Sequence, residues 1–467
     1  MNILRKQDDT IVAISTAVGP GGIGIVRMSG PDALKLADQM FLPKEKKRPS
    51  DFKSFTVHYG WVRRERAGQV EIIDEALLTV MRAPKSYTRE DMVEISSHGG
   101  IVALGAILKL AVGLGARLAD PGEFTKRAFL NGRIDLTQAE AVLDIIQSKT
   151  EAFLRISQNQ LKGELSAELE SIREQLMNVY TQIEAAINFP EEDISPAGQE
   201  SILIQLQTSQ ARVEQLLQSS EQGRILKEGI RVVLCGKPNV GKSSLMNILL
   251  KQPRAIVTPI AGTTRDSIEE TVQIRGIPFQ LIDTAGVFEA DDVIGREAVK
   301  RSRMHIDGAD LVLFVVDRGG GLSQQDEDLL GAIKSPNMIV VLNKCDLPGQ
   351  LDERKLRLLF PHQKKVNVSA LKKTGIDELE AAIVEQVRQG QAGDGRGVWV
   401  SNVRHIQALK NCEEALSGGG KILREGMSLE FVSEEVKEAI KALDSITGRE
   451  VDNDLLEKIF SQFCIGK

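Results

Sequence analysis

The sequence predicts a multidomain protein that combines α+β and α/β parts, and three observations support this fold class. At 467 residues the chain is too long for a single hydrophobic core. Between Gly229 and Val387 apolar strand-like runs alternate with helical stretches, which indicates a mostly parallel sheet with helices on both faces. On either side of this region apolar residues recur with the period of an α-helix, which indicates long packed helices.

Composition and charge describe an ordinary globular protein without an overall basic surface. Hydrophobic residues make up 42% of the chain, charged residues 27%, and the net charge is −6. A nucleic-acid partner would therefore need a local patch or help from another protein. Two short basic runs, Lys44–Arg48 and Arg63–Arg66, are candidates, although such runs are more often solvated loops.

Cysteine usage and the N-terminus predict a cytoplasmic protein. The four cysteines are scattered without the C-x-x-C spacing of zinc sites, and no disulfide framework is indicated. The N-terminus has no apolar core of a signal peptide, and no run of about 18 apolar residues occurs. We therefore expect no membrane partner.

The first 120 or so residues read as a compact α+β domain. Strands are expected at Ile11–Ile14, Gly24–Met28, Ser54–Val62, Glu71–Met81 and Met92–Ser97, and helices at Pro31–Phe41 and Ile101–Leu114. The glycine-rich segment Gly19–Gly24 is either an anion-binding loop or a plain β-turn. Arg27 and Glu94 either grip a polar ligand or lie on the surface.

Helical sequence brackets the middle of the chain. Apolar residues at helical spacing run from Thr137 to Phe189, stop at Pro190–Pro196 and resume over Ile202–Leu226. After a polar, glycine-rich linker the pattern returns at His405–Leu416, Glu434–Leu443 and Asp454–Phe463. This arrangement favours a unit inserted into a helical domain, with three domains in series as the alternative.

Gly236–Ser243, which reads GKPNVGKS, has the context of a phosphate-binding P-loop. It follows the strand-like run Ile230–Cys235 and precedes a helix-like run from Ser244. Backbone N–H groups and the helix N-terminus would face the phosphates, Lys242 would reach them, and Ser243 would offer a hydroxyl to Mg²⁺. Further strands are expected at Phe279–Asp283, Leu311–Asp317, Met338–Asn343 and Lys365–Val368.

Motifs after the P-loop predict guanine as the base. Asp283 to Gly286 places a carboxylate near Mg²⁺ and an N–H near a γ-phosphate. In Asn343 to Asp346 the final carboxylate can accept two guanine donors that adenine lacks, and Ser369-Ala370 can donate a backbone N–H to the guanine carbonyl oxygen. The predicted GTP site comprises Asn239, Val240, Gly241, Lys242, Ser243, Ser244, Thr258, Thr264, Asp283, Thr284, Ala285, Gly286, Asn343, Lys344, Asp346, Ser369 and Ala370.

The hydrolytic step is less obvious, because Val287 follows Gly286 where many GTPases carry a water-orienting glutamine. Asn239, together with the backbone from Thr258 to Thr263, either ligates a monovalent cation near the phosphates or merely caps a turn.

Longer stretches resemble the MnmE (TrmE) family of tRNA modification GTPases over essentially the whole chain. They are Asp9–Ala13, Gly21–Arg27, Ser97–Gly100, Pro121–Arg133, Asp135–Ala141 and the terminal Phe463–Lys467. The resemblance implies a folate-binding, dimerising domain over residues 1–122. It also implies a helical domain formed by residues 123–225 and 389–467, with a Ras-like G domain, residues 226–388, inserted between them.

The resemblance further implies a function and a set of ligands. Such proteins form homodimers and work with a FAD-binding partner, MnmG, in a heterotetramer. They add an aminomethyl-type group to C5 of the wobble uridine of certain tRNAs, with 5,10-methylene- or 5-formyl-tetrahydrofolate as the one-carbon source. Potassium-dependent G-domain dimerisation drives their GTP hydrolysis. The alternative function is a regulatory GTP switch in ribosome assembly.

By position, the resemblance also assigns ligand contacts. Folate contacts fall on Arg27, Glu94, Arg133 and Lys467, potassium contacts on Asn239, Thr258, Ile260 and Thr263, and magnesium contacts on Ser243 and Thr264.

Two positions carry catalytic hypotheses. The segment between Gly286 and Ile294-Gly295 is shorter than in the family, and Asp292 stands where a glutamate acts on the attacking water. Cys464 either has a redox or nucleophilic role near the folate or is a small apolar filler.

Overall fold

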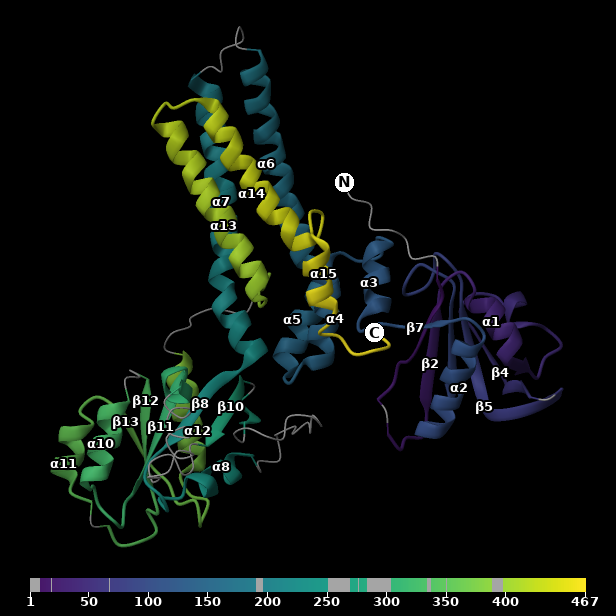
Figure 1. Ribbon diagram of the computed structural model, residues 1–467. Coiled ribbons are helices and arrows are strands. Elements are labelled where there is room, and N and C mark those ends of the chain that lie inside the picture. Colours follow the sequence, from purple (N-terminus) through teal and green to yellow (C-terminus); the bar gives the residue numbers. More distant parts are fainter. Residues whose placement is uncertain are drawn as a thin grey trace, which may run out of the picture. The chain divides into compact units, whose positions relative to one another are not determined.

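The computed structural model describes ten segments of the chain, and they form two compact units (Figure 1). The described residues are 9–17, 19–66, 68–189, 196–250, 269–275, 277–283, 304–333, 337–349, 351–388 and 398–467. The first unit consists of Met1–Leu143, Gln160–Glu192 and Leu429–Lys467, and the second of Asp144–Asn159 and Asp193–Ser428. Both units are therefore discontinuous in sequence.

A seven-stranded sheet dominates the first unit, in the order β3-β4-β5-β6-β2-β1-β7. All neighbouring pairs are antiparallel except β1 and β7, which are parallel. The strands are β1 (Ile11–Ile14), β2 (Gly24–Ser29), β3 (Phe41–Pro43), β4 (Thr56–Arg66), β5 (Gln69–Met81), β6 (Met92–Ser97) and β7 (Arg117–Leu118). All five expected strands are present. The sequence did not reveal β3 and β7, because three and two residues are too few for an alternating pattern.

Helices α1 (Ala33–Met40) and α2 (Ile101–Gly113) pack into one core with the sheet and confirm the two expected helices. The strands alternate between this core and the outside. Along β4 and β5, Val62 and Leu78 are buried, whereas Tyr59 and Leu77 face each other across the strands and are 38% and 45% exposed. The sheet therefore presents apolar side chains on the face turned away from this core.

Helix α3 (Glu123–Leu130) was not expected from the sequence. Its buried positions include Glu123 and Arg127 as well as Phe124. Charged residues thus occupy positions where apolar residues would recur at helical spacing, and the pattern that predicts a helix is lost. These inward charged residues are held by ion pairs rather than by apolar packing.

Arg127 is the centre of this buried ion-pair cluster. Its side chain is 3% exposed, and it donates to Asp9 Oδ1 over 2.6 Å and to Glu123 Oε1 over 2.9 Å. A carboxylate oxygen of Glu90 lies 3.3 Å from Arg127 Nη1. Burial alone would raise the pKa of Glu123, but the hydrogen bonds from Arg117 and Arg127 outweigh it and the pKa lies below its usual value.

The chain's last helix, α15 (Asn453–Phe460), packs its apolar face against the start of α4 (Leu136–Gln147). The expected helix over Asp454–Phe463 is correct in kind but ends three residues early. Beyond it, Ile465 forms an isolated antiparallel bridge with Pro121, just before α3. The C-terminus is thereby attached to the residues that follow the sheet.

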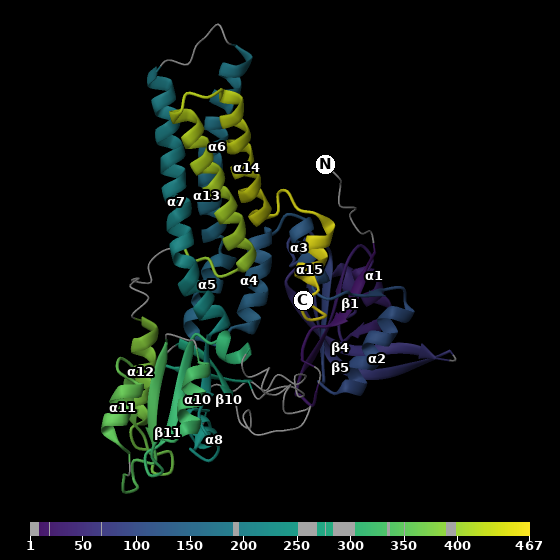
Figure 2. The ribbon, with the colours of Figure 1, turned by 60° about the vertical axis from the view of Figure 1, so that its left-hand side comes forward.

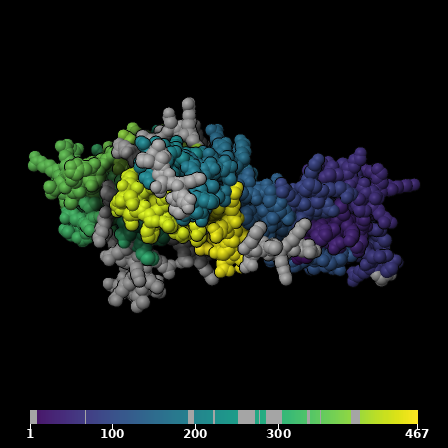
Figure 3. Space-filling view, turned by 90° about the horizontal axis from the view of Figure 1, so that it is seen from above, coloured from purple at the N-terminus to yellow at the C-terminus, as the bar shows by residue number. Residues whose placement is uncertain are grey.

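Two long helices complete the first unit, α6 (Glu164–Asn188) and α14 (Leu429–Thr447), which lie side by side (Figures 1 and 3). Arg173 of α6 bonds to Asp444 of α14 over 2.6 Å, and Ser433 donates to Glu184 over 2.5 Å. In the second unit α7 (Pro196–Glu228) pairs in the same way with α13 (Val403–Arg424) (Figure 2). Together with α5 (Glu151–Leu161) they confirm the expected helical sequence on both sides of the middle region.

The second unit contains a six-stranded sheet in the order β13-β12-β11-β8-β10-β9. It is parallel except for the antiparallel edge strand β9, so the expected mostly parallel sheet is confirmed. The strands are β8 (Ile230–Cys235), β9 (Glu269–Ile274), β10 (Ile277–Asp283), β11 (Leu311–Asp317), β12 (Met338–Asn343) and β13 (Lys364–Asn367). Strand β9, with its two glutamates, was missed because it lacks the apolar run of the buried strands.

Helices cover both faces of this sheet, as the sequence predicted. One core includes residues of α8 (Lys242–Leu250) and α12 (Ile376–Arg388). The opposite core includes residues of α10 (Gln324–Ala332) and α11 (Glu353–Leu359). Among the helices of the described segments, none is long and apolar enough to cross a membrane.

Arg127→Ala is expected to destabilise the first unit by about 3 kcal/mol, because it leaves the buried carboxylate of Glu90 without its cation and leaves Glu123 with Arg117 alone. Urea unfolding followed by the fluorescence of Trp61, in a Trp399→Phe background, measures this. Since the pKa of Glu123 is depressed in the folded state, the contribution of the pair is lost as the pH falls below the usual carboxyl range.

The matched control is Arg64→Ala, which breaks the exposed pair with Glu71 and should barely move the unfolding midpoint. Equal midpoints for the two variants would contradict a structural role for the buried cluster.

Candidate functional site

The loop between β8 and α8 has a backbone that its glycines make possible. Gly236 adopts φ +146°, and a Cβ there would lie 2.3 Å from the carbonyl oxygen of Val315. Gly241 adopts φ +97°, and a Cβ there would lie 2.2 Å from Asn343 Nδ2. Larger residues would therefore strain the loop and collide with the neighbouring strands.

Lys242 begins α8 and turns its amine back into the loop. Its Nζ donates to the carbonyl oxygens of Gly236 and Lys237, each over 2.8 Å, and the residue is 7% exposed. Burial lowers the pKa of Lys242 below its usual value. A phosphate in the loop would supply the negative charge that favours the ammonium form, which is the role predicted for this lysine.

Ser243 and Asp283 form the part of the site that suits a divalent cation. Ser243 Oγ donates to Asp283 Oδ2 over 2.8 Å, which brings together the ends of β10 and the P-loop. Asp283 Oδ1 is buried and has no hydrogen-bond partner among the described residues. A hydroxyl beside a carboxylate with a free oxygen fits Mg²⁺, which prefers oxygen ligands and keeps several waters. No group of three or more His, Cys, Asp or Glu suited to a metal occurs in the described segments.

Asn343 and Lys344, at the end of β12, tie the P-loop to the neighbouring strands. Asn343 donates to the carbonyl oxygen of Val240 over 2.8 Å and accepts from the N–H of Ala370 over 3.0 Å. Lys344 Nζ donates to the carbonyl oxygen of Asn239 over 2.9 Å and to Asp317 Oδ2 over 2.6 Å. The predicted base-recognition residues are thus assembled at one edge of the sheet.

Asp346 is prepared as an acceptor. Ser369 Oγ donates to Asp346 Oδ1 over 2.5 Å, and this hydrogen bond lowers the pKa of Asp346 below its usual value. The carboxyl group is therefore ionised at neutral pH. An ionised carboxylate accepts hydrogen bonds only, which suits the two adjacent donors of guanine.

Asn239, for which the sequence left a turn cap or a cation ligand open, is exposed and has φ +62°. Its carbonyl accepts from Lys344, and its side-chain amide bonds to none of the described residues. Ser244 lies exposed in the first turn of α8. Several predicted site residues lie outside the described segments: Thr258, Ile260, Thr263, Thr264, Thr284, Ala285, Gly286 and Asp292.

A second polar cluster lies in the first unit, around Arg27 of β2. Arg27 Nε donates to Glu94 Oε1 of β6 over 2.8 Å, and the two side chains are 17% and 20% exposed. Arg27 Nη1 also donates to the carbonyl oxygen of Gly466 over 3.1 Å. The interpretation of Arg27 and Glu94 as ordinary surface residues is therefore wrong, since they form a half-buried pair that also holds the C-terminus.

Two aromatic rings complete this cluster. The guanidinium of Arg133 lies 4.7 Å from the centre of the Tyr87 ring, and that of Arg27 lies 6.0 Å from the same ring and 5.6 Å from Phe124. Burial raises the pKa of the Tyr87 hydroxyl. Tyr87 was not among the predicted site residues, because nothing near it in the sequence marks it as part of a site.

The C-terminal tail, residues 464–467, reaches this cluster. The N–H of Phe124 donates to Lys467 O over 3.2 Å, and the N–H of Gly122 donates to Cys464 O over 3.4 Å. Gly466 has φ +91°, and a Cβ there would lie 2.5 Å from the carbonyl oxygen of Ile14. Cys464 is exposed, so the interpretation as a buried apolar filler is wrong. The predicted folate residues Arg27, Glu94, Arg133 and Lys467 thus belong to one neighbourhood.

Comparison with protein families covers both units. A family model described as "MnmE helical domain" matches residues 136–464, and one described as "GTP-binding protein TrmE N-terminus" matches residues 10–133. The chain belongs to the MnmE family. It is similar to proteins named tRNA modification GTPase MnmE. The one from Listeria welshimeri is 45% identical over 460 residues, which cover 98% of this chain and 99% of that protein. The one from Carboxydothermus hydrogenoformans is 44% identical over 462 residues, which cover 99% and 100%.

The MnmE family membership rests on these full-length similarities. Among solved structures, Era of Aquifex aeolicus bound to GDP and aluminium fluoride is 30% identical and covers 40% of this chain and 66% of that chain. The TM-score of this comparison is 0.29.

Asp346→Asn is expected to weaken GDP binding by about 100-fold. The carboxylate can accept two charge-assisted hydrogen bonds from guanine, whereas the neutral amide has one oxygen that accepts and one NH₂ group that donates. The same amide can donate to the carbonyl oxygen that xanthine has in place of the guanine amino group, so xanthosine diphosphate should bind better than to the wild type. Titration with fluorescent GDP and competition by xanthosine diphosphate measure both affinities.

Asp307→Asn, which changes an exposed aspartate elsewhere in the same unit, is the control and should bind GDP as the wild type does. If Asp346→Asn kept the wild-type preference for GDP, the base-recognition role of Asp346 would be wrong.

Proposed function

We propose that this GTP hydrolase modifies tRNA by adding an aminomethyl-type group to C5 of the wobble uridine, together with a flavin-dependent partner of the MnmG type. The curated relatives are named tRNA modification GTPases, and the geometry of the P-loop and of Asp346 supports a guanine-nucleotide site in this chain. The main support for folate-dependent modification of the wobble uridine is the cluster formed by Arg27, Glu94 and the C-terminal tail.

The chemistry of this cluster supports a reduced folate as ligand. Of the two carboxylate oxygens of Glu94, Oε1 is the one bonded to Arg27. A pterin ring presents an amino group beside a ring N–H, a donor pair that suits a carboxylate. Arg133 and Lys467 offer cations for the carboxylates of the glutamyl tail, and the Tyr87 ring offers an apolar wall. When bound, tetrahydrofolate would supply the one-carbon unit as its 5,10-methylene or 5-formyl derivative.

In the nucleotide site, we propose that Ser243 and Thr264 bind Mg²⁺ and that Asn239, Thr258, Ile260 and Thr263 bind K⁺. The free oxygen of Asp283 supports a magnesium site beside Ser243. A monovalent cation next to the phosphates would offset the negative charge that develops as the γ-phosphate leaves. Asp292 is the carboxylate that we propose acts on the attacking water, and Cys464 is the exposed thiol that we propose takes part near the folate.

The assembly that we propose is a homodimer joined through the first unit, which binds MnmG-type partners as a heterotetramer in the cytoplasm. The open face of the sheet supports this contact. Val57 is 59% exposed there, next to Tyr59 and Leu77, and apolar side chains gathered on one face favour association.

The proposal includes a division into domains. Residues 1–122 would bind folate and dimerise, residues 123–225 and 389–467 would form the helical domain, and residues 226–388 would form the G domain. A regulatory GTP switch in ribosome assembly, the alternative from the sequence, gives the polar cluster around Arg27 no role.

Arg27→Gln is expected to weaken binding of 5-formyl-tetrahydrofolate by about 10- to 100-fold, because it removes charge-assisted hydrogen bonds to Glu94 and Gly466. Calorimetric titration of the purified protein measures the affinity. Mass spectrometry of wobble uridines, in cells whose own copy is replaced by this variant, should show loss of the modified nucleoside.

Lys35→Gln, in an exposed pair with Asp32 of the same unit, is the control for both measurements. The proposal would be wrong if the wild-type protein bound no reduced folate and if cells without the protein kept their modified wobble uridines. That result would favour a regulatory switch.

Asn239→Ala is expected to lower the stimulation of GTP hydrolysis by K⁺ relative to Na⁺ by about tenfold or more, because a ligand of the cation is removed. Phosphate release at equal ionic strength in the two salts measures this, with Asn247→Ala on the exposed side of α8 as control. An unchanged ratio would argue that Asn239 does not contact a cation.

A further inference from the structure

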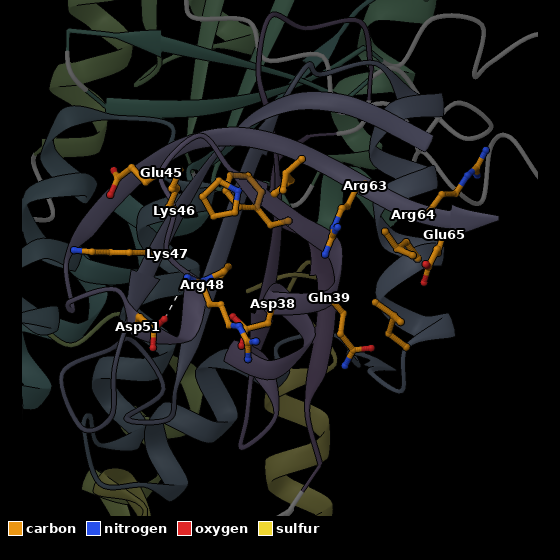
Figure 4. Close-up of a pocket in the computed structure, with 16 residues that line it drawn as sticks. Asp38, Gln39, Glu45, Lys46, Lys47, Arg48, Asp51, Arg63, Arg64 and Glu65 are labelled. Atoms are coloured by element: carbon orange, nitrogen blue, oxygen red, sulfur yellow. Dashed lines mark hydrogen bonds between the residues drawn. The ribbon is translucent and has the colours of Figure 1, made fainter. Parts of the chain in front are cut away.

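A cleft on the first unit brings together the two basic runs that the proposed function has not used (Figure 4). It has a volume of about 800 Å³ and lies along the edge strand β3, between the ends of α1 and α2 and the tip of β4. Its basic lining residues are Lys46, Lys47, Arg48, Arg63 and Arg64. A cavity of this size falls in the range of ligand-binding pockets.

The pairing of β3 with β4 explains why residues distant in the sequence share this cleft. Phe41 pairs with Val62 and Pro43 with Gly60, so the first basic run leaves one end of β3 while the second run lies beyond the other end. Three residues of strand separate the two groups by about 10 Å. Figure 4 shows Lys46 and Lys47 on one side of the cleft and Arg63 on the other. A single phosphate cannot touch both groups, whereas an extended polyanion can.

Three of the four carboxylates at the cleft accept hydrogen bonds from neighbouring groups of the protein and keep their negative charge. Asp38 accepts from the N–H and the hydroxyl of Ser50 over 2.8 and 2.6 Å. Glu45 bonds to His58 over 3.2 Å.

Asp51 accepts from the backbone N–H of Arg48 over 3.3 Å, and Glu65 remains as an exposed carboxylate on the rim. Among the basic residues, Arg64 is paired with Glu71.

The other basic side chains, those of Lys46, Lys47, Arg48 and Arg63, take part in no ion pair among the described residues of the chain. Phosphate oxygens are the groups that such free cations contact in protein complexes with nucleic acids. The five basic side chains of the lining outnumber its four carboxylates, so the cleft carries a small net positive charge on a chain whose net charge is −6.

The cleft also has an apolar floor. Leu42 is 38% exposed, and Leu110 and Leu114 of α2 line the same space. The ribose or base of a nucleotide can contact this apolar floor while the phosphates reach the basic rim. An inorganic anion has no apolar part that could contact the floor. The concave shape is less suited to a flat membrane surface.

We propose that this basic cleft binds the sugar–phosphate backbone of the tRNA substrate. The inference rests on the proposed tRNA-modifying function and adds where on this chain the RNA is held. Contacts of this kind orient the substrate without reading its sequence. The charge on the two rims would let one RNA strand run along β3 from one basic group to the other.

The test compares tRNA binding by the full-length protein and by the double variant Lys46→Gln/Lys47→Gln over a series of salt concentrations. The variant is expected to bind tRNA about tenfold more weakly at low salt. Its slope of log affinity against log salt should fall by roughly one to two, because each lost phosphate contact removes about one released counterion. Thermal unfolding confirms that the variant is folded.

The matched control is Lys437→Gln/Lys441→Gln, which removes two exposed lysines from α14 and should keep the wild-type slope. Polyglutamate and pyrophosphate serve as competitors. An unchanged slope for the cleft variant would overturn this inference while leaving the modification of wobble uridine intact. Polyglutamate binding that depends on the cleft, without a change in tRNA binding, would overturn it in favour of an acidic protein partner. A wild-type protein that binds no tRNA and modifies none would overturn both proposals.

Discussion

The attachment of the C-terminal tail to the N-terminal sheet is the contact on which the first unit's site depends. Gly466 lies so close to the backbone of β1 that a side chain there would collide with the carbonyl oxygen of Ile14. Its own carbonyl accepts from Arg27, which in turn is held by Glu94. The two ends of the chain are thereby joined at a half-buried ion pair, and the terminal Lys467 is brought to the residues predicted to hold a folate.

This attachment requires support from the elements next to it. Helix α3 is anchored by the buried Arg127. The partners of Arg127 are Asp9 before β1, Glu90 in the loop after β5 and Glu123 of α3 itself. Helix α15 packs on α4 through an apolar face and delivers the tail to Pro121. The ion pairs thus fix the orientation of α3, and the apolar contacts fix the position of α15.

The nucleotide site follows a different logic, because its parts lie at the ends of neighbouring parallel strands. In such a sheet the carboxyl ends of the strands meet at one edge, so P-loop, Asp283 and Asn343 converge without any long-range contact between chain ends. Hydrogen bonds from Asn343 and Lys344 to the P-loop then connect base recognition with phosphate binding. This explains why the nucleotide residues that lie in the described segments could be predicted from local sequence.

The sequence by itself determined the elements with strong periodic patterns and the nucleotide site, because both depend on residues that are near one another in the chain or in fixed order along it. It did not determine β3, β7 or α3, which are too short or too charged to show a period. Only the tertiary structure decided that Arg27 and Glu94 form a pair, that Tyr87 belongs beside Arg133, and that two basic runs flank one cleft. These facts depend on strand order and on contacts between distant parts of the chain, and residue spacing along the sequence carries no information about either.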